Sequence, residues 1–227
     1  MARTLDLAAH TVRREAFVDA AQRLMQAKGY EEMSIQDLPD DLDVSRGAFY
    51  HYFESKQALL EAVVERMADV VLASLAPVTE DPTLSAGAKL EQLFGGIGQW
   101  KTDRRALVMS LLRVWVSDHN AIFREKVRRR LVSRLVPLFT RIVEQGVGDG
   151  AFTTGSPAET AMVLVMLILG FQDRALELFL ARQENTIGYD DVERIFASYN
   201  QAFERVLGAP AGTLNLIDRK TLSAWFG

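Results

Sequence analysis

Residues 44–56, VSRGAFYHYFESK, place five ring-bearing side chains in consecutive positions: Phe49, Tyr50, His51, Tyr52 and Phe53. On a helical wheel that advances about 100° per residue, Phe49, Tyr52 and Phe53 fall on one side. Tyr50 and His51 fall on the opposite side, together with Gly47. We therefore expect Phe49 and Phe53 to hold a short helix in a core with Tyr52 at its edge, while Tyr50 and His51 project outward.

The rest of the chain repeats its apolar residues with a helical period, and alternating strand patterns are absent. This pattern predicts an all-α fold. The expected helices lie near 11–28, 35–42, 45–52, 55–75, 86–101, 104–117, 120–146, 157–184 and 190–207, with a further short one within 219–226.

Several residues predict where helices begin, bend or end. Ser34 and Asp37 have the spacing at which two side chains cap each other, and Ser156, Pro157 and Glu159 have the pattern of a full capping box. Pro137 falls inside a predicted helix and is expected to kink or split it.

Composition limits the classes of protein that this chain can be. The 227 residues are 48% hydrophobic, include no cysteine and carry a net charge of −4, which excludes disulfides and thiolate metal sites. The longest apolar run, residues 161–171, is about half the length of a membrane span, and no signal peptide is evident. We therefore expect a soluble, cytoplasmic protein.

Residues 11–52 have the spacing of a helix-turn-helix, because a turn of about three residues around Asp43 joins the second and third predicted helices. The third helix of such a unit can enter the major groove of DNA. Residues 1–56 contain seven basic and ten acidic side chains, so any binding to DNA depends on where the charges lie.

The segment FVDAAQRLMQAKGYEEMSIQDLPDDLDVSRGAFYHYFESKQALLEAV, residues 17–63, resembles the DNA-binding segment of TetR/AcrR-type bacterial transcriptional regulators. The resemblance covers roughly residues 12–63. Its matching features are Ala20-Ala21, Leu24, Gly29-Tyr30, Ser34-Ile35, Val44-Ser45, Gly47, Phe49-Tyr50, Tyr52-Phe53, Ser55-Lys56 and Leu59-Leu60. In the turn, Asp43 stands where the family commonly has glycine, and Asp40 and Asp41 add further negative charge near the expected DNA surface.

The resemblance implies contacts to double-stranded DNA from named positions. Tyr50, Lys56 and the hydroxyl or backbone N–H of Ser34 would bind phosphates, while Ser45 would cap the recognition helix and leave its free N–H groups facing the DNA. Arg46, Gly47, Ala48 and His51 would lie in or near the groove. Arg46 matches the O6 and N7 acceptors of guanine, although a phosphate contact is an alternative role for it.

The resemblance also implies a domain boundary, with a DNA-binding domain at 1–54 and a helical ligand-binding and dimerisation domain at 55–227. The last two long helices would form a four-helix bundle across a homodimer, whereas the alternative is a hairpin within one chain. The candidate interface residues are Val165, Leu169, Leu176, Ile195, Tyr199 and Phe203.

The middle helices are candidates to enclose a cavity for a small-molecule effector, because methionine and aromatic side chains suit an adaptable apolar pocket. Plain core packing is the alternative for each of the candidates Phe94, Trp100, Met109, Leu112, Trp115, Phe123, Met162, Met166 and Phe171.

No catalytic or cofactor motif stands out, so we expect neither an enzyme nor a metal site. The sequence predicts a homodimeric regulator, most often a repressor in this family, that an effector releases from a palindromic operator. The alternatives are a ligand-independent DNA-binding factor and a helical small-molecule-binding protein with a vestigial helix-turn-helix.

Overall fold

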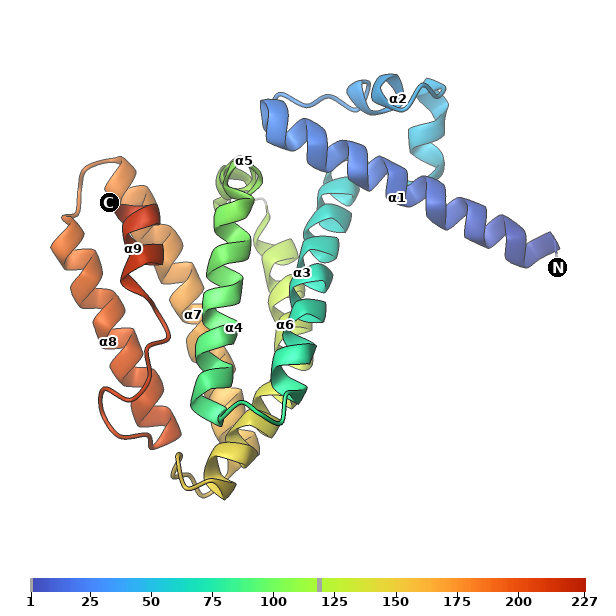
Figure 1. Ribbon diagram of the computed structural model, residues 1–227. Helices are drawn as coiled ribbons and strands as arrows, with labels where there is room; N and C mark the ends of the chain where they lie inside the picture. The colour runs from blue at the N-terminus through green and yellow to red at the C-terminus, as the bar shows by residue number, and fades with distance from the viewer. Residues whose placement is uncertain (1, 118–119) are drawn as a thin grey trace. The chain divides into compact units, whose positions relative to one another are not determined.

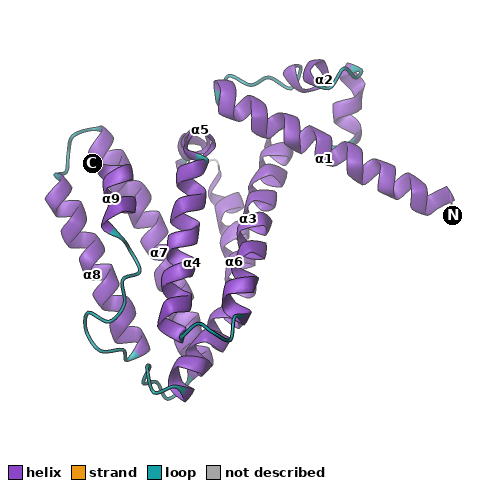
Figure 2. Cartoon of the chain, in the orientation of Figure 1, coloured by secondary structure: helices purple, strands orange, loops and turns teal. Residues whose placement is uncertain are grey.

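The computed structural model describes residues 2–117 and 120–227, and these residues form helices and loops without a strand (Figures 1 and 2). In chain order the elements are α1 (Ala2–Lys28), α2 (Asp37–Asp41), the 3₁₀ helix η1 (Arg46–His51), α3 (Lys56–Glu80), α4 (Ala86–Asp103), α5 (Arg105–Val116), α6 (Ala121–Gly148), α7 (Pro157–Gln183), α8 (Tyr189–Leu207) and α9 (Arg219–Phe226). The predicted all-α fold is confirmed.

The chain divides into two compact units that do not follow the boundary expected at residue 54. The first unit combines the residues up to Val70 with Arg104–Lys126, and the second combines Val71–Asp103 with Val127–Gly227. The N-terminal part of α3 and the whole of α5 therefore belong to the first unit. Both α3 and α6 continue without interruption from one unit into the other.

The core of the first unit explains why distant segments join it. Leu59, Leu60 and Val63 of α3 and Leu107, Leu111 and Val114 of α5 are buried in one cluster with α1, α2 and η1. Ala20 and Ala21 of α1 are fully buried. Their small side chains let neighbouring helices approach α1 closely.

The second unit buries a separate core that α4, α6, α7 and α8 share with the C-terminal segment. Asn200 on α8 donates to the carbonyl of Leu214 at 2.8 Å and accepts from the N–H of Leu216 at 3.1 Å. Gly98 on α4 leaves room for Thr221, whose methyl carbon would lie 3.3 Å from an added Cβ. Side-chain hydrogen bonds and a close helix approach thus hold α9 and the segment before it against the core (Figure 1).

Three details of the helices test the predicted signals. The mutual capping of Ser34 and Asp37 is confirmed, with the Ser34 N–H donating to the Asp37 carboxylate at 2.6 Å and the Asp37 N–H donating to Ser34 Oγ at 3.3 Å. The prediction of a capping box at Ser156 is wrong, because the side chain of Ser156 makes no capping hydrogen bond.

The expected split at Pro137 is absent, since α6 is one helix from Ala121 to Gly148; the expected kink stays a prediction. A proline within a helix costs about 3 kcal/mol. Leu135 and Phe139, on either side of Pro137, are both buried, and their burial offsets that cost.

Candidate nucleic-acid interface

The third element of the helix-turn-helix is a 3₁₀ helix rather than the α-helix that the sequence predicted. Within and beside η1 the N–H of Ala48 donates to the carbonyl of Ser45 at 2.9 Å, and that of Tyr52 donates to Phe49 at 3.0 Å. Ser45 occupies the N-cap position, but its side chain makes no capping hydrogen bond, so the predicted hydroxyl cap is also wrong. Only six residues form the helix, and such short pieces commonly adopt 3₁₀ geometry.

Two of the five rings fix η1 to the first unit. Phe49 is 0% exposed and Phe53 is 3% exposed, and their rings stack with centroids 5.8 Å apart. The ring of Phe17 on α1 meets both of them edge-on. Tyr52 is partly buried between Phe17 and His10. The division predicted from the helical wheel therefore holds, although the helix type differs.

The opposite side of η1 forms an exposed surface, which we term the recognition face; its residues are Ser45, Arg46, Gly47, Ala48, Tyr50 and His51. Tyr50 is 62% exposed, and Ala48 alone is partly covered. A Cβ added to Gly47 would meet no atom within 4 Å. A partner can therefore approach the backbone of η1 closely at this point.

The turn before η1 requires an unusual backbone conformation, which Asp43 adopts with φ at 51°. Aspartate visits this left-handed region more readily than most residues, so the aspartate in place of the family's glycine is tolerated. Arg23 of α1 pairs with Asp41 at 2.6 Å, and the Gln36 amide donates to Asp40 at 2.7 Å. Two of the three turn carboxylates are thus engaged within the unit.

Ser34 has less hydrogen-bonding capacity for a phosphate than its sequence position suggests. Its backbone N–H is engaged by Asp37, whose N–H in turn occupies the Ser34 oxygen. The hydroxyl hydrogen of Ser34 can still be donated to a phosphate. Asp37 also pairs with Lys28 at 2.6 Å, and the hydrogen bond from Lys28, followed by those from Ser34, lowers the pKa of Asp37 to about 2.

Lys56 lies across the ring of Tyr30, with its Nζ 4.4 Å from the ring centroid and 3.1 Å from the carbonyl oxygen of Glu31 to which it donates. Burial lowers the pKa of the Lys56 ammonium, and the nearby Glu31 carboxylate opposes this shift. Burial also raises the pKa of Tyr30 to about 12. Ser55 caps α3, since its Oγ accepts from the N–H of Ala58 at 3.0 Å.

Three residues that orient side chains of the candidate interface were not assigned to the site from the sequence. Arg23, Lys28 and Tyr30 orient Asp41, Asp37 and Lys56 respectively. Arg23 and Lys28 are recognisable in the sequence as basic residues late in α1. Their partners lie 18 and 9 residues further along the chain, so the ion pairs could be identified only from the structure.

The sequence model described as "Bacterial regulatory proteins, tetR family" matches residues 17–63, the span that contains the helix-turn-helix and the start of α3. The helix-turn-helix segment of this chain is therefore similar to that of the TetR family.

Two HTH-type transcriptional regulators are similar to this chain over a longer span. The uncharacterised HTH-type transcriptional regulator YfiR of Bacillus subtilis is 26% identical over 66% of this chain and 74% of its own length. The HTH-type transcriptional repressor KstR2 of Rhodococcus jostii is 22% identical over 69% of this chain and 76% of its own. Both are named as transcriptional regulators and not as enzymes.

A likeness in fold to a solved structure extends over most of the chain. The solved structure of a SmeT–triclosan complex aligns with a TM-score of 0.59 over 90% of this chain and 97% of that one, at 19% identity. At this identity the likeness concerns the fold. No helix in the described part of the chain is long and apolar enough to cross a membrane, and no three metal-binding side chains gather within residues 2–117 and 120–227.

The residues predicted to line one effector pocket are divided between the two units. Met109, Leu112, Trp115 and Phe123 belong to the first, whereas Phe94, Trp100, Met162, Met166 and Phe171 belong to the second. Phe94 and Phe171 pack against the buried ring of Phe203, as core packing predicts. The first unit has an open cavity of about 510 Å³ that includes Phe123, Glu31 and Glu61 in its lining.

The exposed apolar surface of α7 differs from the predicted dimer residues. Val165, Leu169 and Phe203 are buried in the core of their own unit, so these three are not available to a partner. Leu176, Ile195 and Tyr199 are partly buried. The apolar surface that α7 exposes consists of Met162, Val163 and Met166, which are 38%, 52% and 46% exposed; we term this set the α7 patch.

Proposed function

We propose that this TetR-family regulator binds a palindromic DNA operator as a homodimer and that a small-molecule effector releases it. The recognition face carries this proposal, because η1 presents exposed polar side chains from a rigid base of buried rings. Arg46, Gly47, Ala48 and His51 enter the major groove, with Arg46 directed at a guanine. Ser45 presents the N-terminal backbone of η1.

Phosphate contacts on either side of the groove position the unit on DNA. We assign them to Tyr50, Lys56 and the hydroxyl of Ser34. Lys56 lies partly covered on Tyr30, and this arrangement holds the ammonium in one place before DNA arrives. Phosphate contacts fix the register, while the base contacts of η1 select the sequence.

The α7 patch supports the dimer. α7 is apolar on nearly all sides, and its buried side fills the core of its own unit. The exposed methionines and valine are then available to a second copy of the chain, because contiguous exposed apolar surface commonly marks a protein interface. Two copies place two recognition faces on the half-sites of a palindrome.

The effector acts by preferring one of two states of the dimer. A ligand that binds the state with the lower DNA affinity shifts the population toward it in proportion to its differential affinity. SmeT was solved in complex with triclosan, and KstR2 is named a repressor; these two similar proteins support a small-molecule effector and a repressor role.

Selection of duplexes from a random library, followed by fluorescence anisotropy over a range of salt concentrations, tests the proposal. We expect an enriched inverted repeat, a stoichiometry of one dimer per site, and affinity that falls steeply with salt. Absence of binding to every duplex at low salt would contradict it. A thermal-shift screen of small molecules then separates an effector-controlled regulator from a ligand-independent factor, since only the former gains stability and loses operator affinity.

A further inference from the structure

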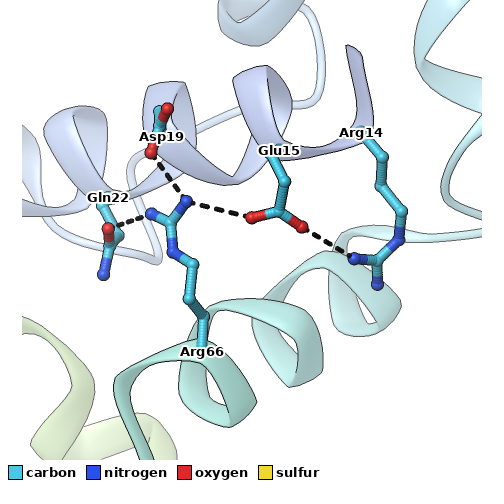
Figure 3. A network of polar contacts seen from close by, with 5 residues as sticks. All are labelled: Arg14, Glu15, Asp19, Gln22 and Arg66. Carbon is cyan, nitrogen blue, oxygen red and sulfur yellow. Dashed lines mark hydrogen bonds and ion pairs between the residues drawn. The ribbon is translucent and has the colours of Figure 1, made fainter. Parts of the chain in front are cut away.

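Arg66 of α3 makes a three-way contact with one face of α1 (Figure 3). Its guanidinium donates to Asp19 Oδ1 at 2.6 Å, to Glu15 Oε2 at 3.4 Å and to the side-chain oxygen of Gln22. These acceptors recur at the four- and three-residue spacing that places side chains on one side of a helix. The Arg66 side chain is 23% exposed, so the contact is shielded in part from solvent.

The Arg66 contact fixes the relative position of α1 and α3 more strictly than the apolar core of the first unit does. Apolar contacts between α1 and α3 are non-directional and resist sliding or rotation of the two helices only weakly. The planar fork of arginine fixes direction as well as distance. Because its three acceptors lie on successive turns of α1, the fork sets both the axial register and the rotation of α1 against α3.

A continuous series of contacts then leads from Arg66 to the recognition face. The second oxygen of Glu15 accepts from Arg14 at 3.3 Å, as Figure 3 also shows. The Arg14 guanidinium lies over the ring of Phe53, 5.0 Å from its centroid. Phe53 stacks on Phe49, the fully buried ring of η1.

The position of Arg66 along α3 gives this series its significance. Arg66 lies one turn before Val70, the last residue of the first unit in this helix, and α3 continues to Glu80 in the second unit. The helix that connects the units is therefore fixed to α1 close to the point at which it leaves the first unit.

We propose that Arg66 is a positioning residue for DNA binding, which sets the orientation of the recognition face through Glu15, Arg14 and Phe53 without touching DNA. This inference rests on the proposed function. It assigns the arginine on α3 a role that differs from that of Lys56, ten residues earlier on the same helix, which we assign to a phosphate.

Anisotropy titrations of the full-length protein on its selected operator, over a range of salt concentrations, test the role of Arg66. We expect Arg66→Met to weaken operator binding about five- to tenfold, the effect of losing roughly one net charge-assisted hydrogen bond. The slope of log affinity against log salt stays as in the wild type, because no phosphate contact is lost. Arg66→Lys, which keeps the charge but not the fork, should lose most of the same affinity.

Glu15→Gln provides a second and milder variant that tests the path. If Arg66 acts through Glu15, the losses from the Arg66→Met and Glu15→Gln variants combine to less than their sum in the double variant. Arg174→Met is the matched control, since Arg174 pairs with exposed Glu177 on the same helix α7 in a 2.7 Å contact, and the operator affinity of this variant should remain near the wild-type value.

The possible outcomes separate the inference from the proposed function. Unchanged affinity in the Arg66→Met variant, a slope reduced by about one, wild-type binding in the Arg66→Lys variant, or strictly additive losses would each overturn the role of Arg66 while leaving the operator function intact. Failure of the wild-type protein to bind any duplex would instead overturn the function itself, and the inference with it.

Discussion

The recognition face and the α7 patch are both exposed surfaces beside buried cores, but they present different chemistry. Beside the buried rings of Phe49 and Phe53, η1 exposes an arginine, a tyrosine hydroxyl and an imidazole. Beside the buried Val165 and Leu169, the α7 patch consists of methionine and valine side chains. The first surface suits the charged and hydrogen-bonding surface of DNA, and the second suits another protein.

The largest effect should come from removing the buried side of η1. Phe49→Ala should lower the free energy of unfolding of the first unit by about 3–5 kcal/mol, because it deletes a buried aromatic ring and leaves a cavity. Hydrogen–deuterium exchange of α1 amides and thermal denaturation measure this loss. The matched Tyr50→Ala change on the exposed side should cost less than about 0.5 kcal/mol; equal losses would contradict the division of η1 into two sides.

Substitutions in the α7 patch should affect dimer assembly more than folding, whereas substitution of Phe49 affects folding. Changing Val163 and Met166 together to aspartate should weaken the dimer at least about tenfold, or roughly 1.4 kcal/mol, because charges would be buried against apolar groups. Sedimentation velocity over a concentration series measures dimerisation. Val147→Asp, at an exposed valine near the end of α6, is the control, and an unchanged dimer in the double variant would exclude α7 as the interface.

Arg46→Ala tests whether the recognition face reads bases. The loss of a two-pronged guanine contact should cost about 1–3 kcal/mol and relax preference at one position in each half-site. Repeating the duplex selection with the variant measures this. A uniform loss over all sequences would instead assign Arg46 to the phosphate backbone.

Lys56→Ala tests a contact that should carry no sequence information. We expect weaker binding across all duplexes and a salt slope reduced by about one, since one phosphate loses its cation. Anisotropy at four or more salt concentrations measures the slope. A slope equal to that of the wild-type protein would remove Lys56 from the phosphate contacts.

The smallest effect concerns Asp37 of α2, which pairs with Lys28. The pKa of Asp37 is lowered to about 2 in the folded protein, chiefly by Lys28, so its contribution is present above about pH 4 and is lost as pH falls toward 2. Asp37→Asn should cost at most about 1 kcal/mol at neutral pH, because the pair is partly exposed. It should also flatten the fall in melting temperature between pH 4 and 2, which calorimetry can follow; an unaltered acid profile would contradict this.

The two surfaces also differ in how far they could be predicted. In η1 the apolar and polar side chains separate on a helical wheel, so burial of Phe49 and exposure of Tyr50 followed from the pattern alone. Along α7 the apolar residues surround the helix, and the pattern gave no reason to prefer Val165 over Met166 for the partner. The core residues of α8, α4 and α6 decide that question, and they lie elsewhere in the chain.

Helix capping also could be predicted only in part from the sequence. Ser34 and Asp37 cap each other as their spacing predicts, whereas Ser156 does not, although its pattern is the stronger one. At Ser156 the backbone N–H donates to Thr154 Oγ1 at 3.3 Å, and this neighbouring contact accompanies a conformation in which the serine side chain does not cap α7.

The sequence by itself determined the helical fold, the positions of most helices, the helix-turn-helix, its resemblance to the TetR family and the two sides of η1. Each of these depends on residues close together in the chain, whose period and spacing carry the information. Only the tertiary structure decided that α5 packs in the first unit, which side of α7 is exposed, and that Arg66 forms hydrogen bonds and ion pairs with α1. These features join residues about 20 to 90 positions apart, and their packing depends on geometry that no local pattern records.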